Sequence, residues 1–265
     1  MKALVSATLI TALCAAFCGG YAQAAGIGDI VLAMPFDEGE GEATMDISPH
    51  RNHGTLMGNA GWGIGKFGNA LQVEPVGYVD AGADSSLSLF DTDFTIAVWV
   101  NMKETVAHQH GFMAQDEGGG PENNKWMLRY NKGGVRSVNF HIHRADGGSM
   151  QLEPGFWRAN PDTWYQVAVV RFGNKYTFYS DGKRDLELES DLAVAKFIDA
   201  PVTIGWAEGP IATDGLIDEA LIVKRAFTPD EIKTHFEGGV HDVLAVQPQG
   251  KSAAVWGAIK ARTLR

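Results

Sequence analysis

Residues Gly215–Gly239 read GLIDEALIVKRAFTPDEIKTHFEGG, and this stretch predicts a buried strand, a turn and a short helix. From Gly215 to Val223 apolar side chains fall on both faces of an extended chain, which is typical of a strand in the middle of a sheet with layers on each side. Thr228 and Glu231 form the pattern of a capping box around Pro229, and the closing glycine pair ends the helix.

Two adjacent acids, Asp218 and Glu219, interrupt this apolar strand. An ionised carboxylate in such a place is costly unless it is paired, hydrogen-bonded or bound to a metal. Asp218 is therefore expected to cap backbone N–H groups, to pair with Lys224 or Arg225, or to bind a cation. For Glu219 we expect hydrogen bonds to neighbouring backbone.

The two ends of the chain differ from its body. Residues 1–24 are predicted to be a signal peptide, because Lys2 precedes an apolar run and Ala22-Gln23-Ala24 is a small-x-small cleavage pattern. A single domain is expected over residues 25–240, followed by a basic tail at 241–265. Both cysteines, Cys14 and Cys18, lie in the signal segment, so an exported domain without disulfides is predicted.

The charge balance narrows the classes of partner. The chain has 32 Asp and Glu against 22 Lys and Arg, a net charge of −10 at pH 7. Such a balance argues against a nucleic acid or an anionic membrane surface as partner. Beyond the signal segment no apolar run is long enough to span a bilayer. We expect a secreted, periplasmic or cell-surface location.

The body of the chain predicts short strands separated by turns, and few helices. Such a pattern indicates an all-β, two-sheet antiparallel sandwich with one short C-terminal helix. The strands are expected at 29–36, 70–73, 77–80, 93–102, 126–130, 135–143, 164–171, 175–180, 185–188, 201–206 and 215–223.

Six motifs in order carry a resemblance to a known family. They are Phe36-Asp37-Glu38-Gly39, Asp46 with Asn52-His53-Gly54-Thr55-Leu56, residues Gly65 to Leu71, residues Phe94 to Val100, residues Trp164 to Val170 with Tyr179-Ser180-Asp181-Gly182, and Ile217-Asp218-Glu219 with Arg225 to Thr228. Over about residues 29–239 the chain resembles a bacterial LamG-like jelly-roll domain. The resemblance implies the concanavalin A-like lectin/glucanase sandwich, which hosts lectins, adhesion modules and some glycosidases, so it does not fix the function.

The resemblance also implies a structural calcium ion near the rim of the sandwich. Calcium takes roughly six to eight oxygen ligands. The side chains expected to supply them, together with loop carbonyls, are Asp37, Asp46, Asn52 and Asp218.

The acidic residues do not form a glycosidase pattern. Retaining glycosidases need two carboxylates about 5 Å apart, and the glucanases that the chain resembles carry Glu-x-Asp-x-x-Glu along one strand, a run absent from this sequence. The pairs Asp37-Glu38 and Asp218-Glu219 are adjacent, so their members point to opposite faces of a strand. We therefore predict a protein that is not an enzyme.

Ligand recognition is expected in the polar loops and beside them. Asn124, Trp126, Arg144 and Trp157 are the predicted ligand contacts, because lectin-type sites combine an aromatic face with polar groups; the alternative is that the tryptophans fill the core. His141 and His143 share a strand face, which favours a solvent-facing side, a sugar or peptide platform, or, with His108 and His110, a transition-metal site.

The sequence thus predicts an exported, non-enzymatic binding module. It is expected to recognise carbohydrate or an extracellular protein through loops of a calcium-stabilised sandwich. Two alternatives stay open at this point: a divergent glycan-active hydrolase of the same fold, and a purely structural exported domain.

Overall fold

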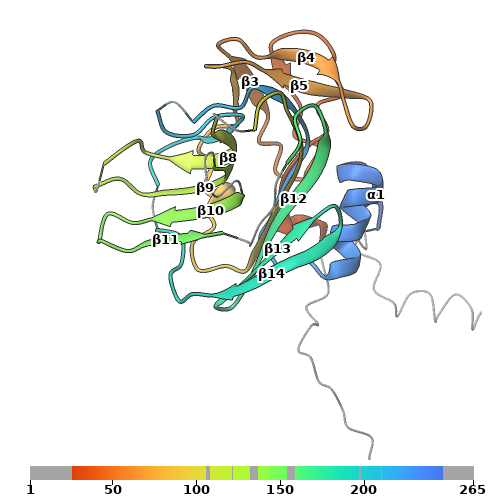
Figure 1. Cartoon of the computed structure of the whole chain (residues 1–265). Coiled ribbons are helices and arrows are strands. Elements are labelled where there is room, and N and C mark those ends of the chain that lie inside the picture. The colour runs from red at the N-terminus through yellow and green to blue at the C-terminus, as the bar shows by residue number, and fades with distance from the viewer. Residues whose placement is uncertain are drawn as a thin grey trace, which may run out of the picture.

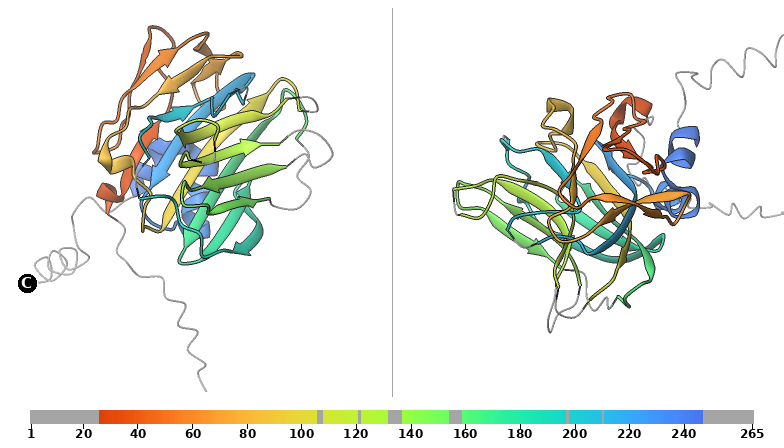
Figure 2. Two further views of the ribbon diagram at one scale, coloured as in Figure 1. Left: turned by 90° about the vertical axis from the view of Figure 1, so that its left-hand side faces the viewer. Right: turned by 90° about the horizontal axis from the view of Figure 1, so that it is seen from above.

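A computed structural model describes residues 26–105, 108–120, 122–131, 137–153, 159–196, 198–209 and 211–246. The predicted sandwich is confirmed: two 8-stranded sheets face each other, and every strand pair in them is antiparallel. Figure 1 shows the two sheets with one helix outside them, and Figure 2 adds views from the side and from above. The predicted signal peptide, the tail beyond Val246 and Trp157 lie outside the described residues.

The first sheet, called sheet A, contains the stretch that decides the fold. Its strands run in the order β14-β13-β12-β7-β16-β5-β4, with β1 paired to β16. Their bounds are β1 Ile30–Met34, β4 Gly61–Ile64, β5 Asn69–Val73, β7 Phe94–Met102, β12 Trp164–Phe172, β13 Lys175–Ser180, β14 Lys183–Glu189 and β16 Gly215–Val223. Strand β16 lies between β7 and β5, as its two apolar faces predict.

The second sheet, called sheet B, runs in the order β11-β10-β9-β8-β15-β6-β3-β2. Its bounds are β2 Ala43–Thr44, β3 Gly54–Met57, β6 Tyr78–Asp80, β8 His110–Asp116, β9 Lys125–Tyr130, β10 Val138–His143, β11 Ser149–Leu152 and β15 Val202–Ile204. Figure 2 (left) looks onto this sheet, where β8 to β11 run side by side. Two short 3-10 helices, Ile27–Asp29 and Ser85–Leu87, complete the elements besides α1.

The main core fills the space between the two sheets. Alternate residues of each strand point into it, and its largest wholly buried side chains include Trp126, Phe94, Phe140 and Tyr176. The Phe94 and Phe140 rings come from opposite sheets, and their centroids are 5.7 Å apart. Because aromatic pairs at such distances stabilise beyond the area that they bury, these rings join the sheets at the centre of the sandwich.

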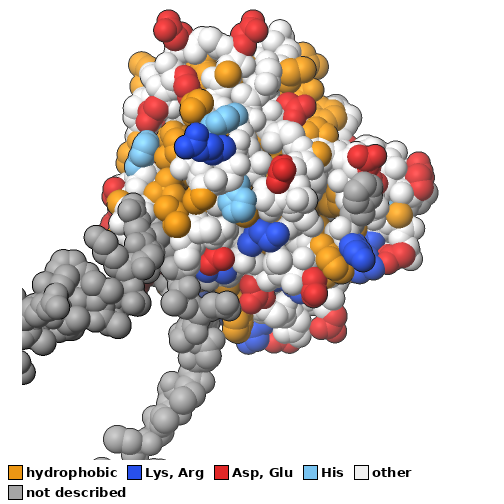
Figure 3. Space-filling model, turned by 180° about the vertical axis from the view of Figure 1, so that it is seen from behind, with side chains coloured by type: hydrophobic (Ala, Val, Ile, Leu, Met, Phe, Trp, Pro, Cys, Tyr) orange, Lys and Arg blue, Asp and Glu red, His pale blue; other side chains and the backbone are white. Residues whose placement is uncertain are grey.

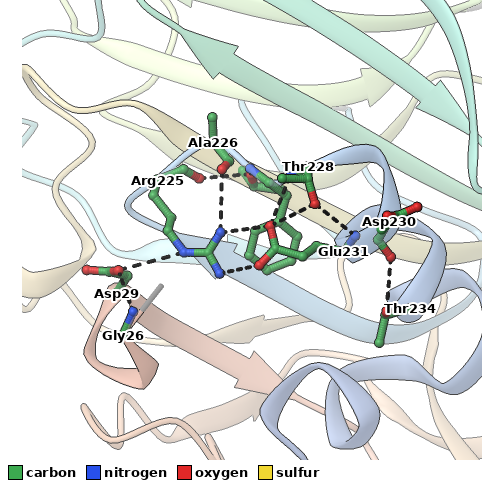
Figure 4. A network of polar contacts seen from close by, with 10 residues as sticks. Gly26, Asp29, Arg225, Ala226, Thr228, Asp230, Glu231 and Thr234 are labelled. Atoms are coloured by element: carbon green, nitrogen blue, oxygen red, sulfur yellow. Dashed lines mark hydrogen bonds and ion pairs between the residues drawn. The ribbon is translucent and has the colours of Figure 1, made fainter. Parts of the chain in front are cut away.

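Helix α1, Pro229–Val246, covers the outer face of sheet A, on the far side from sheet B. A second cluster of buried apolar side chains lies between them, including Ile232 and Val240 of the helix and Leu221 of β16. The predicted capping box is present: Thr228 N–H donates to Glu231 at 2.9 Å, and Glu231 N–H donates to the Thr228 hydroxyl at 3.3 Å (Figure 4). Sheet A is therefore the middle of three layers.

The helix is longer than the sequence predicts, and it breaks at Gly239. There φ is +67° and ψ is −161°, and the chain then continues as helix to Val246. A β-carbon at this glycine would lie 2.3 Å from the Glu219 carboxyl group. Only glycine therefore fits the conformation and the close approach together. Among the described residues no helix is long and apolar enough to cross a membrane.

Candidate binding site

The four predicted calcium ligands form two separate pairs. In the first pair, Asn52 N–H donates to the Asp46 carboxylate at 2.7 Å. The same carboxylate, 2% exposed, also accepts from Ala33 N–H, Ser48 N–H and the Ser48 hydroxyl, each at 2.8 Å. The Asn52 side-chain amide donates to the Val31 carbonyl at 2.8 Å and to the Ser86 hydroxyl at 2.9 Å. Hydrogen-bond donors thus already surround the Asp46 carboxylate, which ties β1 to the following loop.

The second pair is Asp37 and Asp218, near the break in α1. One oxygen of Asp218 accepts from Lys66 N–H at 2.8 Å and from Phe67 N–H at 3.0 Å, while the other accepts from Glu219 N–H. Asp37 accepts from Asn69 N–H at 3.2 Å. The prediction that Asp218 caps backbone N–H groups is thus confirmed.

Burial decides the charge of the two acids on β16. It raises the pKa of Asp218 to about 7 and that of Glu219 to about 8, and the hydrogen bonds from backbone N–H groups only partly oppose this effect. Glu219 accepts from Val240 N–H at 2.5 Å, so its expected bonding to backbone is confirmed. Glu219 is therefore largely protonated at neutral pH and acts as the cap of the second half of α1.

Among the described residues, no three His, Cys, Asp or Glu side chains are grouped so that they could hold a metal ion. Asp37, Asp46, Asn52 and Asp218 consequently do not fit a calcium ion that all four would share. Calcium binding stays a prediction from the family resemblance.

The predicted ligand contacts also separate into different places. Asn124 and Arg144 lie where two polar loops meet, since Ala145 N–H donates to the Asn124 side chain at 2.9 Å. Trp126, in contrast, is wholly buried, and its ring lies 6.4 Å from that of Phe140 in the core. The prediction that Trp126 contacts a ligand is therefore wrong. Alternate side chains of β9 point into the core, Trp126 is one of them, and its indole N–H donates to the Gln115 side chain.

The opposite side of the same strands carries a row of polar side chains. We call the outward residues Asp116, Lys125, Arg129, Asn139, His141, His143 and Gln151 the polar face. Cross-strand pairing places them together: His143 opposite Lys125, Asn139 opposite Arg129, and Gln151 opposite His141. Met127 lies between Lys125 and Arg129 on β9 and packs against Ala207 and Ile211, which cover part of the sheet here. The polar face is thus partly covered rather than an open surface.

His141 is the unusual member of this face. It is 8% exposed, and neither ring nitrogen has a hydrogen-bond partner among the described residues. Burial, and then the charges of Arg129 and Lys125, lower the pKa of His141 to about 4, so it is neutral at pH 7. Its cross-strand neighbour Gln151, on the edge strand β11, is exposed. A neutral imidazole with no partner can donate one hydrogen bond and accept another.

Lys125 and Arg129 are the two buried cations of the polar face. Lys125, 3% exposed, contacts the carboxylates of Glu208 and Asp116, the latter at 3.6 Å, and donates to the Gly118 carbonyl at 2.7 Å. Arg129, 7% exposed, donates to the side-chain oxygens of Asn139 at 3.0 Å and Gln151 at 3.3 Å. Within the described part of the chain, Arg129 takes part in no ion pair, so its charge is met only by neutral amides and more distant acids.

Of this face, sequence reasoning missed Asp116 because it missed β8. His110 to Asp116 reads HGFMAQD, which neither alternates in polarity nor contains a β-branched residue. The histidine face of β10 was found through its spacing, whereas Lys125 and Arg129 went unnoticed. Their spacing in the sequence could have identified them. Lys125 and Arg129 share one face of the strand with Met127, whereas Trp126 and Leu128 between them point into the core. The predicted transition-metal site has no support in this geometry, because His108 and His110 lie at the other end of the sheet B strands, where His110 pairs with Tyr130.

The face of the molecule seen from behind carries a different set of side chains. Figure 3 shows hydrophobic side chains gathered there, with His and basic side chains in small groups and acidic ones scattered around them. A groove of about 450 Å³ is lined by Ile27, Met45, Asp46, Ile47, Ser48, Pro49, Arg51 and His53. Among its polar groups, the Asp46 carboxylate already accepts four hydrogen bonds.

Known structures share this architecture at low sequence identity. Domain 4 of AbnA, a GH43 extracellular arabinanase from Geobacillus stearothermophilus solved with arabinotriose, matches with a TM-score of 0.61 and 17% identity, over 77% of this chain and 96% of that one. The binding domain of Paraclostridial Mosquitocidal Protein 1 matches with a TM-score of 0.62 and 12% identity, over 79% of this chain. The receptor binding domain of a botulinum neurotoxin C/D mosaic serotype matches with a TM-score of 0.61 and 10% identity, over 80%. The chain spans about half the length (52%) of each of these two toxin binding domains.

A search of curated protein sequences gave no significant match. Residues 76–233, however, match the family described as the concanavalin A-like lectin/glucanases superfamily. This region includes β7 to β16, and with them both the polar face and the strand that decides the fold. The chain therefore belongs to the concanavalin A-like lectin/glucanase superfamily, as its motifs and its two facing sheets indicate.

Proposed function

We propose that this chain is an exported, non-enzymatic binding module that recognises carbohydrate at the polar face. The observation that carries the proposal is His141, whose two ring nitrogens lie buried without partners. A buried polar group left unpaired costs about 1–3 kcal/mol. A sugar hydroxyl both donates and accepts hydrogen bonds, so a pair of hydroxyls satisfies both nitrogens of a neutral imidazole.

The neighbours of His141 support carbohydrate over an apolar ligand. Arg129, Asn139 and Gln151 are fixed by hydrogen bonds to one another, so their free groups need little ordering on binding. The loop beside them is fixed too, because Glu117 accepts from Asn124 N–H and from Asp199 N–H, each at 2.7 Å. A rigid array of amides and cations suits a ligand rich in hydroxyl groups. The arabinanase domain of similar fold, solved with arabinotriose, agrees with this class of ligand.

The carboxylates around the polar face support binding rather than hydrolysis. Asp116 and Glu208 both contact Lys125, and Asp116 also accepts from the backbone N–H groups of Gly118 and Glu208. Glu153 accepts from the Asn131 side chain at 2.7 Å. A glycosidase needs one carboxylate as acid and a second as nucleophile or base. Acids already committed to cations and backbone are poor candidates for either role.

The experiment uses residues 25–265 of this chain on a glycan array, with a hydrolysis assay of every oligosaccharide that binds. We expect binding without product, and a loss of about tenfold or more in affinity for His141→Ala. His241→Ala is the matched control, because His241 is 59% exposed on α1 and should leave binding unchanged. Hydrolysis abolished by one carboxylate substitution, or binding unaffected by His141→Ala, would overturn the proposal.

Export is proposed from residues 1–24. The measurement is the mass of the protein recovered after expression of the full chain in a bacterium with its secretion machinery. Removal of the segment should leave a protein that begins at Ala25 outside the cytoplasm. Recovery of the uncleaved chain in the cytoplasm would contradict export and leave the proposal on carbohydrate untouched.

A further inference from the structure

We infer that the polar face selects an acidic sugar, whose carboxylate pairs with Arg129 while its hydroxyls bond His141. This inference rests on the proposed carbohydrate binding and names its ligand class more narrowly. The ligand is an oligosaccharide that carries a uronic acid among neutral residues.

The first observation is the contrast between the two buried cations of β9. Lys125 and Arg129 point to the same side of one strand and are both more than nine-tenths buried. Lys125 is neutralised by Asp116 and Glu208. Arg129 has no carboxylate within ion-pair distance in the described part of the chain. A buried charge is normally paired, because leaving it unpaired is expensive, so Arg129 is the place on this face where an anion is missing.

The second observation is how Arg129 is held. Its Nε donates to Asn139 at 3.0 Å and one terminal nitrogen to Gln151 at 3.3 Å. Glu153 reaches Arg129 only through the Asn139 amide, which donates to it at 3.5 Å, and Glu208 acts on Arg129 without an ion pair. Burial lowers the pKa of Arg129, and more distant acids oppose this effect only in part. A guanidinium fixed on its Nε side in this way still has N–H groups with which to bind a carboxylate through two parallel hydrogen bonds.

The third observation is the position of His141. His141 lies on β10, two positions after Asn139 on the same outward side of the strand. It is the diagonal cross-strand neighbour of Arg129 on β9, and side chains in this relation lie about 7–8 Å apart. One sugar ring spans such a gap, so a carboxylate on Arg129 leaves ring hydroxyls within reach of the imidazole. The charged or titratable groups that face His141 are Arg129, Lys125, Glu208 and His143, and three of these are basic residues. Since Lys125 is already paired with Asp116 and Glu208, Arg129 is the cation beside His141 that remains for a ligand carboxylate.

The net charge of −10 limits the ligand to few charges. A polyanion would be repelled by the net negative charge of the protein. An oligosaccharide with a single uronate can pair its carboxylate with Arg129, and its neutral residues are not repelled by the protein. This is why the inference names an isolated acidic sugar rather than a polyuronate.

The test compares oligosaccharide pairs that differ only at one C6 position, such as cellobiouronate and cellobiose, on an array and then by calorimetry. We expect the uronate of at least one pair to bind about tenfold or more tightly than its neutral counterpart, since a hydrogen-bonded charge contributes more than a neutral bond. Arg129→Gln should remove this preference. Arg184→Gln, on β14 of sheet A, should keep it, because Arg184 is exposed and lies on the other sheet.

A methyl-esterified uronate makes the test independent of any variant that fails to fold. With the wild-type protein, the ester should bind no better than the neutral sugar, and its hydrolysis back to the acid should restore the preference. Equal binding of acid, ester and neutral sugar would overturn the acidic-sugar inference and leave carbohydrate binding standing. Absence of binding to every oligosaccharide on the array would overturn both.

Discussion

The carboxyl group of Glu219 accepts a hydrogen bond from the backbone N–H of Val240 at 2.5 Å, although the two residues are 21 positions apart. Glu219 lies at an irregularity of β16 with φ +55°, and Val240 starts the second half of α1 after the break at Gly239. A side chain from sheet A thus caps the second half of α1, in place of a residue that neighbours it in the sequence. It explains a buried acid in an apolar strand without catalysis or metal.

The first prediction tests whether Glu219 stabilises the fold as a hydrogen-bond acceptor rather than as a negative charge. Glu219→Ala leaves Val240 N–H buried without an acceptor and should lower the free energy of unfolding by about 1–3 kcal/mol. Glu219→Gln keeps an acceptor of the same shape and, because Glu219 is largely protonated at neutral pH, should stay within about 0.5 kcal/mol of wild type. Urea denaturation at pH 6.5 measures both. An equal loss in the two variants would contradict the capping role.

The second prediction concerns His235 and acid stability. The ring of His235 is wholly buried, with one nitrogen 2.8 Å from the Glu219 carbonyl and the other 2.9 Å from the Gln166 amide nitrogen. Because Gln166 donates, the imidazole is neutral, and burial lowers its pKa to about 4. In the unfolded chain a histidine titrates near 6.5.

Between those two values the unfolded state binds more protons than the folded state. Stability is therefore fully present above about pH 6.5 and falls as the pH drops toward 4. His235→Gln should flatten this fall, and melting temperatures between pH 7 and pH 4.5 measure it. A variant whose melting temperature falls as steeply as that of wild type would show that other groups control the acid limit.

The third prediction concerns Asp46 and metal removal. Asp46→Ala leaves several buried donors unpaired and should lower the free energy of unfolding by at least about 2 kcal/mol. EDTA should leave the melting temperature of wild type unchanged, because these donors already surround the carboxylate. A rise in melting temperature on addition of calcium to EDTA-treated protein would contradict this account and support the calcium site that the family resemblance implies.

The fourth prediction distinguishes the core from the polar face on one strand. Trp126→Phe should lower the free energy of unfolding by about 1–3 kcal/mol, because Trp126 is wholly buried between the sheets. Its effect on affinity for an oligosaccharide found on the array should be less than about twofold. A large loss of affinity in a folded Trp126→Phe variant would restore the residue as a ligand contact.

The fold could be predicted from the sequence because its signals are local and repeated. The two apolar faces of β16, the Thr228–Glu231 capping box and the Asp181-Gly182 turn each require only neighbouring residues. Strands β2, β3, β4, β8 and β11 were missed, since they are very short, glycine-containing or lack alternation. In β8 the outward residues are buried by Ala207 and Ile211, which no local pattern reveals.

The site was harder to predict because it depends on contacts between distant segments. The i, i+2 spacing of His141 and His143 identified the correct side of β10. That Lys125 is neutralised while Arg129 is not follows from Glu208, which is 83 residues from Lys125 in the chain. The arrangement of Asp37, Asp46, Asn52 and Asp218 could not be predicted for the same reason: the donors of Asp218 and Asp37 come from segments 152 and 32 residues away, and these contacts divide the four into two pairs.

The most direct measurement of the central claim is the nitrogen chemical shifts of the histidine side chains, recorded while an oligosaccharide from the array is added to saturation. We predict large changes at the two imidazole nitrogens of His141, which gain their partners from the ligand, and none at those of His235, which are already bonded within the protein. His141 resonances that stay unchanged when the protein is saturated with ligand would contradict the assignment of the polar face as the binding site.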